Sequence, residues 1–283
     1  MFVYAVTNHK GGVGKTTAAA TLGAAFVRLG RRVLLIDLDP QSGLTTAVGA
    51  RPAALTVEDV VGVPLAAERA IVPCASGMEI IPARATLAIK LQAVTDEHSP
   101  NRRIAAALET LEARFDTVVI DCASGIGAGI ANALTAAHIA LVPMQCDFLS
   151  LRGLADTQAI CGAIVQAANS RLRIRAFASM YDRRTTYAVD VLAEARVTLG
   201  TRMLDAVVPR SVRLAEAPAT GTTVLDFAPK SPGATAYCCI ARELVEGEQG
   251  YGTTGRHTGG NTQSTHHSRR RGIGGTALAA ASA

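Results

Sequence analysis

The sequence TNHKGGVGKTTAAA occupies residues 7–20, and it decides the fold. The apolar segment FVYAV precedes it, and an alanine-rich segment with helical character follows it. Gly11, Gly12 and Gly14 allow the backbone to turn so that several N–H groups point to one place, at the positive end of the following helix. A glycine-rich loop that lies between a strand and a helix and ends in Lys-Thr is typical of a triphosphate site. The alternative is a purely structural turn.

Two side chains of this loop have the chemistry that a nucleotide needs. Lys15 places a positive charge on the β- and γ-phosphates, and the hydroxyl of Thr16 is the expected Mg²⁺ ligand. His9 stands where the common pattern has glycine, and Lys10 follows it. A monomer that already has Lys15 has no evident use for the second lysine.

Outside the loop, strand and helix patterns alternate along the chain. Helix termination is expected at Gly30, and Thr56 with Asp59 three residues later is typical of a helix start. The pattern predicts a doubly wound, mostly parallel α/β sheet with helices on both faces. The expected strands are 2–7, 32–40, 78–83, 116–124, 138–144, 171–180 and 204–209, and the expected helices are 15–30, 56–61, 101–115, 126–137, 151–169, 188–199 and 233–246.

Composition divides the 283 residues into one domain, 1–246, and a tail, 247–283. Residues with large apolar side chains are almost absent from 247 until Ile273, so we expect the tail to be disordered. The tail carries +3 of the net charge of +5, which leaves the domain close to neutral. The domain can therefore bind an acidic polymer only through a local patch.

Cysteine usage and hydropathy predict a cytoplasmic protein. The six cysteines show no metal-ligand spacing, which favours free thiols in a reducing compartment. The first residues lack the basic leader of a signal peptide, and no apolar run approaches the ~20 residues that cross a bilayer.

Acidic residues follow two of the apolar strands. Asp37 ends VLLID and Asp121 ends TVVID, while Asp39 lies two residues after the first of them. Parallel strands next to the phosphate loop end at the same edge of the sheet, so these carboxylates are candidates for holding Mg²⁺ and its waters. The alternative is that each is a loop-start or capping residue.

Five segments together resemble one family, the ParA/MinD group of deviant Walker-type P-loop NTPases, and most closely its short, Soj-like ParA partition proteins. The segments are KGGVGKTT, VLLIDLDPQ, DTVVIDC, ALVPMQCDFLSLRGL and VVPRSVRLAEAPATG. The resemblance implies an ATPase with ATP and Mg²⁺ as cofactors. It implies a homodimer in which two monomers sandwich two nucleotides and Lys10 reaches the partner's phosphates.

The same resemblance assigns roles to individual positions. It implies that Lys10, Lys15 and Asp39 support hydrolysis, and that Thr16, Asp37 and Asp121 organise the magnesium ion. The implied nucleotide contacts are Lys10, Gly11, Gly12, Val13, Gly14, Lys15, Thr16 and Thr17, with Pro209 and Arg210 near the adenine.

The resemblance also implies partners. Arg184, next to Arg183, and Arg213 correspond to positions that bind DNA without sequence preference, and surface solvation is the alternative for each. A ParB-like centromere-binding protein would stimulate hydrolysis and release a nucleoid-associated dimer. We expect no membrane partner and, without a helix-turn-helix segment before Met1, no sequence-specific repression.

Departures from the family keep other functions open. Where many relatives have Asp-Cys-Pro-Pro-Ser, this chain has Asp121-Cys122-Ala123-Ser124-Gly125, which predicts a more flexible loop. A MinD-like membrane-positioning ATPase would need an amphipathic C-terminal helix, and GIGGTALAAASA has only two larger apolar residues. An amide synthase or iron-sulfur carrier would need pocket residues or paired cysteines that are not visible.

Overall fold

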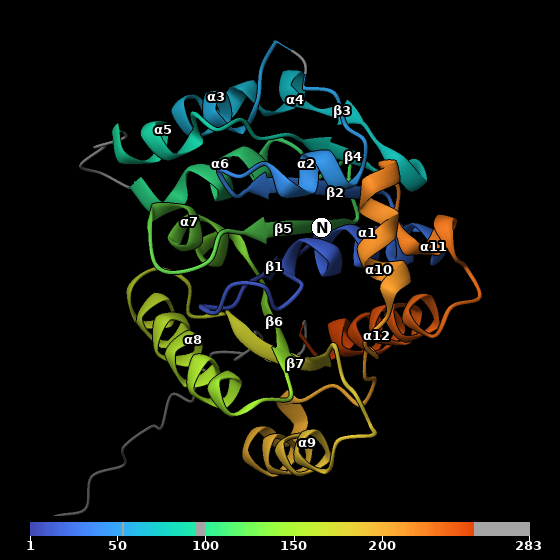
Figure 1. Cartoon of the computed structure of the whole chain (residues 1–283). Coiled ribbons are helices and arrows are strands. Elements are labelled where there is room, and N and C mark those ends of the chain that lie inside the picture. Colours follow the sequence, from blue (N-terminus) through green and yellow to red (C-terminus); the bar gives the residue numbers. More distant parts are fainter. Residues whose placement is uncertain (53, 94–99, 252–283) are drawn as a thin grey trace, which may run out of the picture.

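A seven-stranded sheet forms the centre of the computed structural model, which describes residues 1–52, 54–93 and 100–251. The strand order is β3-β4-β2-β5-β1-β6-β7 (Figure 1), and every neighbouring pair is parallel except β3 with β4. The predicted doubly wound α/β fold is therefore confirmed. The strands are β1 (Phe2–Val6), β2 (Val33–Leu38), β3 (Val72–Pro73), β4 (Glu79–Ile81), β5 (Thr117–Cys122), β6 (Ile139–Gln145) and β7 (Arg173–Ser179).

Helices cover both faces of this sheet because its central strands are apolar on both sides. In β1, Val3 and Ala5 face one core, whereas Tyr4 and Val6 face the other. In Figure 1, α1 and α12 lie on one face, and α7 lies on the opposite one. The helices are α1 (Lys15–Arg28), α2 (Gly43–Ala47), α3 (Val57–Gly62), α4 (Ala67–Ala70), α5 (Leu87–Ala93), α6 (Arg103–Glu109), α7 (Ala128–Ala136), α8 (Phe148–Ala167), α9 (Thr186–Leu199), α10 (Val212–Glu216), α11 (Val224–Phe227) and α12 (Pro232–Glu248).

Local signals set several helix ends. Gly30 has a φ of 80° and stops α1, as expected. The backbone N–H of Thr56 donates to Asp59 Oδ2 at 2.9 Å, which confirms the predicted start of α3. Helix α6 is shorter than the predicted 101–115, because the Thr110 hydroxyl donates to the Ala107 carbonyl at 2.7 Å and the chain continues in turns.

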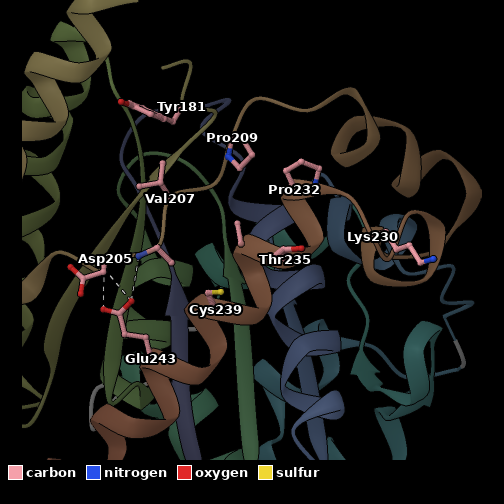
Figure 2. Close-up of a pocket in the computed structure, with 11 residues that line it drawn as sticks. Tyr181, Asp205, Val207, Pro209, Lys230, Pro232, Thr235, Cys239 and Glu243 are labelled. Atoms are coloured by element: carbon pink, nitrogen blue, oxygen red, sulfur yellow. Dashed lines mark hydrogen bonds between the residues drawn. The ribbon is translucent and has the colours of Figure 1, made fainter. Parts of the chain in front are cut away.

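The strand predicted over 204–209 is wrong. This segment runs beside β7, and its Leu204 and Val208 amides donate to the β7 carbonyls of Ala176 and Ala178, but it pairs as isolated bridges at Met203 and Pro209 and not as a strand. Its amides at Asp205 and Ala206 instead donate to the carboxylate of Glu243 on α12, at 3.1–3.5 Å (Figure 2).

We expect Glu243→Ala to lower the free energy of unfolding by about 2–3 kcal/mol, because it leaves backbone N–H groups without their charged acceptor. Urea denaturation measures this change. The matched control is Glu246→Ala, an exposed position on the same helix, which should change stability by less than about 0.5 kcal/mol. Equal stability of the two variants would contradict the anchoring role of Glu243.

The end of α12 is fixed at the sheet edge opposite the glycine-rich loop. Glu248 accepts a hydrogen bond from the Tyr4 hydroxyl at 2.8 Å and pairs with Arg31 at 2.8 Å. The ring of Tyr251 packs edge-on against Phe2 with 5.3 Å between centroids, and its hydroxyl donates to the His138 carbonyl. Residues beyond the predicted boundary at 246 thus contact the sheet through Glu248 and Tyr251, and the division into domain and tail stays a prediction. The rest of the predicted tail, 252–283, lies outside the described residues and stays a prediction.

None of the described helices combines the length and apolar composition needed to cross a bilayer.

Candidate nucleotide site

The loop between β1 and α1 has the backbone conformation that the glycines allow. Gly12 and Gly14 have φ values of 73° and 90°, which side-chain-bearing residues rarely adopt. Asn8, which is fully buried, anchors the loop because its amide donates to the Pro143 carbonyl at 2.8 Å and its Oδ1 accepts the Lys10 N–H at 2.9 Å. The loop is thus fixed to β6 before any ligand binds.

Lys15 is buried beneath this loop. Its ammonium donates to the Lys10 carbonyl at 3.2 Å and to Ser124 Oγ at 2.7 Å. Burial lowers the pKa of Lys15, and the nearby Asp121 acts in the opposite direction. The Lys15 ammonium therefore lies beneath the glycine-rich loop, where the effect of its burial exceeds that of the neighbouring negative charges.

Lys10 contacts a different part of the same chain. Its ammonium lies 2.6 Å from Asp147 Oδ2 and 3.2 Å from Gln145 Oε1, at the end of β6. About a quarter of the Lys10 side chain is exposed, and 40% of Asp147 is. An ion pair this exposed contributes about 0–1 kcal/mol, so Lys10 can exchange its partner at little cost.

The three predicted carboxylates meet at the edge of the sheet next to Lys15. Asp37 and Asp121 are register partners on β2 and β5, and both are completely buried. Asp37 accepts from the Thr45 N–H and hydroxyl at 2.8 and 2.7 Å, and from the Asp39 N–H at 3.1 Å. Burial raises the pKa of Asp37, while these hydrogen bonds act against it.

Asp121 has no set of hydrogen bonds like the three that Asp37 accepts. Neither of its carboxylate oxygens has a hydrogen bond of normal geometry within the described residues. Burial raises its pKa well above the usual range, and repulsion by Asp37 adds to this, whereas the Thr16 hydroxyl and Lys15 lower it. A buried, unsatisfied carboxylate next to a second one is an arrangement that a divalent cation would stabilise.

The oxygen donors of Thr16, Asp37 and Asp121 fit a magnesium ion that also binds a nucleotide. They do not fit a metal site in which protein side chains supply every ligand. No group of three or more His, Cys, Asp or Glu side chains with metal-holding geometry occurs in the described ranges. Mg²⁺ usually keeps several waters and binds one or two carboxylates together with phosphates. Thr16, Asp37 and Asp121 are the residues that would hold it directly or through water.

A cavity of about 370 Å³ adjoins the loop on its other side and is large enough for a purine. Its walls include Gly14 and Thr17 of the loop region, together with Pro209 and Arg210 from the far end of the chain. Met180 also lines it, with an unusual φ of 51°. The structure thus brings the predicted adenine-side residues to the phosphate loop.

Figure 2 shows a second, more open groove of about 760 Å³ between α12 and the segment 205–209. It shares Pro209 with the first cavity, but its described lining contains no residue of the glycine-rich loop. Since phosphate binding needs that loop, we assign the base to the smaller cavity.

The predicted DNA-binding arginines are exposed and each has a local acidic partner. Arg184 donates twice to Asp182, at 2.9 and 2.7 Å, and Arg213 pairs with Glu216 at 2.8 Å. Arg184 lines a groove of about 530 Å³ with Arg183 and Arg210, and Val212, the residue before Arg213, also lines it. The arginines therefore gather at one end of the molecule, next to the base cavity.

Sequence reasoning missed several residues of this site: Asn8, Ser124, Gln145, Asp147 and Met180. Gln145 ends the apolar strand β6 and Asp147 follows it, so the rule that selected Asp37 would have found them. Asn8 and Ser124 carried no such signal, because their roles depend on contacts between distant segments.

Comparisons with known proteins show which family this chain belongs to. A family model described as an AAA domain matches residues 1–174. The chromosome partitioning protein ParA of Caulobacter vibrioides is 37% identical over 253 residues, which cover 87% of this chain and 95% of that protein. The sporulation initiation inhibitor protein Soj of Bacillus subtilis is 33% identical, over 86% of this chain and 98% of its own. This chain belongs to the ParA/Soj family.

Solved structures show the same fold as this ParA/Soj chain. A Mycobacterium smegmatis protein described as cobyrinic acid a,c-diamide synthase, with bound ATP analog and magnesium, is 34% identical with a TM-score of 0.77. The match covers 90% of this chain and 97% of that one. The septum site-determining protein MinD of Pyrococcus horikoshii, in complex with Mg-ADP, is 23% identical with a TM-score of 0.69, over 89% of this ParA/Soj chain and 99% of its own.

Proposed function

We propose that this protein is a DNA-segregation ATPase that switches between a monomer and an ATP-bound dimer. MgATP binds through the glycine-rich loop, two protomers close on two nucleotides, and the dimer binds DNA without sequence preference. A ParB-like partner on a centromere-like site then stimulates hydrolysis, which releases the dimer from the nucleoid. Family membership supports the general role, and Lys10 is the observation that carries the dimer switch.

Lys10 supports dimerisation because a single protomer already has a phosphate-binding lysine, Lys15, and does not need a second one. Lys15 already supplies the cation beneath the loop, whereas Lys10 lies outside it on a weak, partly exposed pair with Asp147. A second protomer that presents phosphates would offer Lys10 a more highly charged partner.

The carboxylates support hydrolysis in different ways. Bound magnesium would neutralise charge that develops on the phosphate oxygens. Asp37 is held rigidly by Thr45 and can orient water in the ion's shell. Asp39 is less buried and accepts only the Gln41 N–H at 2.9 Å among the described groups, so its second oxygen is available to position an attacking water.

Sedimentation with DNA and with liposomes tests this function. Protein is mixed with DNA, or with liposomes that contain anionic lipid, in the presence of ATP, ADP or no nucleotide. We expect DNA binding only with ATP and no liposome binding. ATP-dependent liposome binding without DNA binding would instead indicate a MinD-like membrane-positioning ATPase.

Arg213→Glu should weaken DNA binding about tenfold and lower the salt dependence by about 1 per protomer, because a cation aimed at phosphate becomes an anion. ATP affinity should be unchanged. Fluorescence anisotropy with labelled DNA at several salt concentrations measures both quantities.

The matched control is Arg69→Glu, an exposed arginine on α4 at the other end of the sheet. It makes the same change in net charge, so equal loss of DNA affinity in both variants would argue against a local patch.

Amide synthesis is the second candidate, because the Mycobacterium smegmatis structure carries that description. An amide synthase would hydrolyse ATP only with an acid substrate and an amide donor present. ATP turnover that responds to DNA and the partner protein, and not to glutamine or ammonia, would exclude it.

A further inference from the structure

Ser124 lies directly across the glycine-rich loop in this structure. It belongs to the loop between β5 and α7, and its Oγ accepts a hydrogen bond from Lys15 Nζ at 2.7 Å. A side chain added at Gly11 would meet this same oxygen at 3.6 Å. Two loops that are more than a hundred residues apart in sequence therefore meet at the phosphate-binding cation.

The hydrogen-bonding capacity of this pair is only partly used. The Lys15 ammonium has three donors, and two of them go to Ser124 and to the Lys10 carbonyl. The Ser124 hydroxyl accepts from Lys15, and its own proton has no acceptor within the described part of the chain. One N–H and one O–H thus remain for an anion that binds between them.

The position of Ser124 relative to the glycine-rich loop indicates which phosphate it would contact. The backbone N–H groups of the glycine-rich loop would enclose the phosphates from the side of α1. Ser124 approaches from the neighbouring strand, three residues after Asp121, where the magnesium residues lie. A phosphoryl group offers three terminal oxygens, so one can accept from Lys15 while another accepts from Ser124.

We propose that Ser124 binds the γ-phosphate and makes this protein discriminate ATP from ADP. The inference rests on the proposed ATP-dependent function and adds a contact to it. Gly125, with a φ of 94°, gives the loop freedom to follow the phosphate.

Nucleotide affinity tests the proposal without relying on turnover. Binding of ADP and of a non-hydrolysable ATP analogue is measured by titration calorimetry with Mg²⁺, for the wild type, Ser124→Ala and Ser124→Thr. Ser124→Ala should weaken binding of the ATP analogue about tenfold or more and leave ADP affinity within about twofold, because only the γ-phosphate loses a donor. Ser124→Thr retains the hydroxyl and should restore the discrimination.

Ser170→Ala is the matched control, since this exposed serine lies at the opposite edge of the sheet, before β7. It should leave both affinities unchanged. Thermal unfolding of each variant confirms that it is folded.

Three results would overturn the proposal. Equal affinities in the wild type and Ser124→Ala would show that the hydroxyl makes no contact with the nucleotide. Equal weakening of the ATP analogue and ADP would indicate a structural role, and tighter binding of both would show that Ser124 competes with phosphate for Lys15. Failure of the wild type to bind any nucleotide would instead refute the proposed function itself.

Discussion

Lys15→Ala is expected to lower the affinity for both ATP and ADP by more than about a hundredfold, since it removes the only cation buried beneath the phosphate loop in the described structure. Several backbone N–H groups would remain, but they cannot replace a full charge in a desolvated site. Calorimetry or fluorescent-nucleotide titration measures the loss. The protein should stay folded, because the Lys15 ammonium makes two hydrogen bonds, to Ser124 and to the Lys10 carbonyl, and its side chain is not part of the apolar core.

The control for Lys15→Ala is Lys230→Ala. Lys230 is exposed and lines the open groove of Figure 2. We expect normal nucleotide affinity in this variant. If Lys230→Ala lost affinity while Lys15→Ala kept it, the nucleotide would belong in the other groove and the assigned site would be wrong.

Lys10→Ala should separate nucleotide binding from dimerisation. A monomer keeps Lys15 and the loop amides, so its ATP affinity should change by less than about threefold. The ATP-dependent dimer should disappear at micromolar protein, because a charged contact to the partner's phosphates is lost. Size-exclusion chromatography with light scattering, with and without ATP, measures the dimer.

Asp147→Asn is the matched comparison for Lys10→Ala. It keeps the shape of the side chain but removes the negative charge that lies 2.6 Å from the Lys10 ammonium. We expect dimerisation at equal or lower ATP concentration. Normal ATP-dependent dimers of Lys10→Ala would contradict the sandwich and leave Lys10 as a structural residue of the β6 edge.

The features that sequence could predict are those with a strong local signal. The strands β1, β2, β5 and β6 are nearly continuous apolar runs because helices cover both of their faces, and each was expected close to its observed position. The glycine-rich loop was recognisable because its backbone demands glycine at Gly12 and Gly14. The proximity of Asp37 and Asp121 is predictable because neighbouring parallel strands end at one edge of the sheet.

The features that sequence could not predict depend on partners far along the chain. The segment 204–209 has the composition of a strand, but Glu243 on α12 takes two of its amides. The short helices α2, α10 and α11 have four or five residues each, too few to show a period. The contacts of Lys15 with Ser124 and of Lys10 with Asp147 span more than a hundred residues.

The anchoring of Tyr251 has a practical consequence for imaging this protein in cells. Tyr251 packs on Phe2, at the start of β1, whereas the phosphate loop follows the other end of that strand. A fluorescent protein inserted directly after Tyr251 would begin at the edge of the sheet that faces away from the nucleotide. Labels at that point should therefore report position without blocking closure of two protomers, whereas a label joined next to α10 would lie beside the arginine groove.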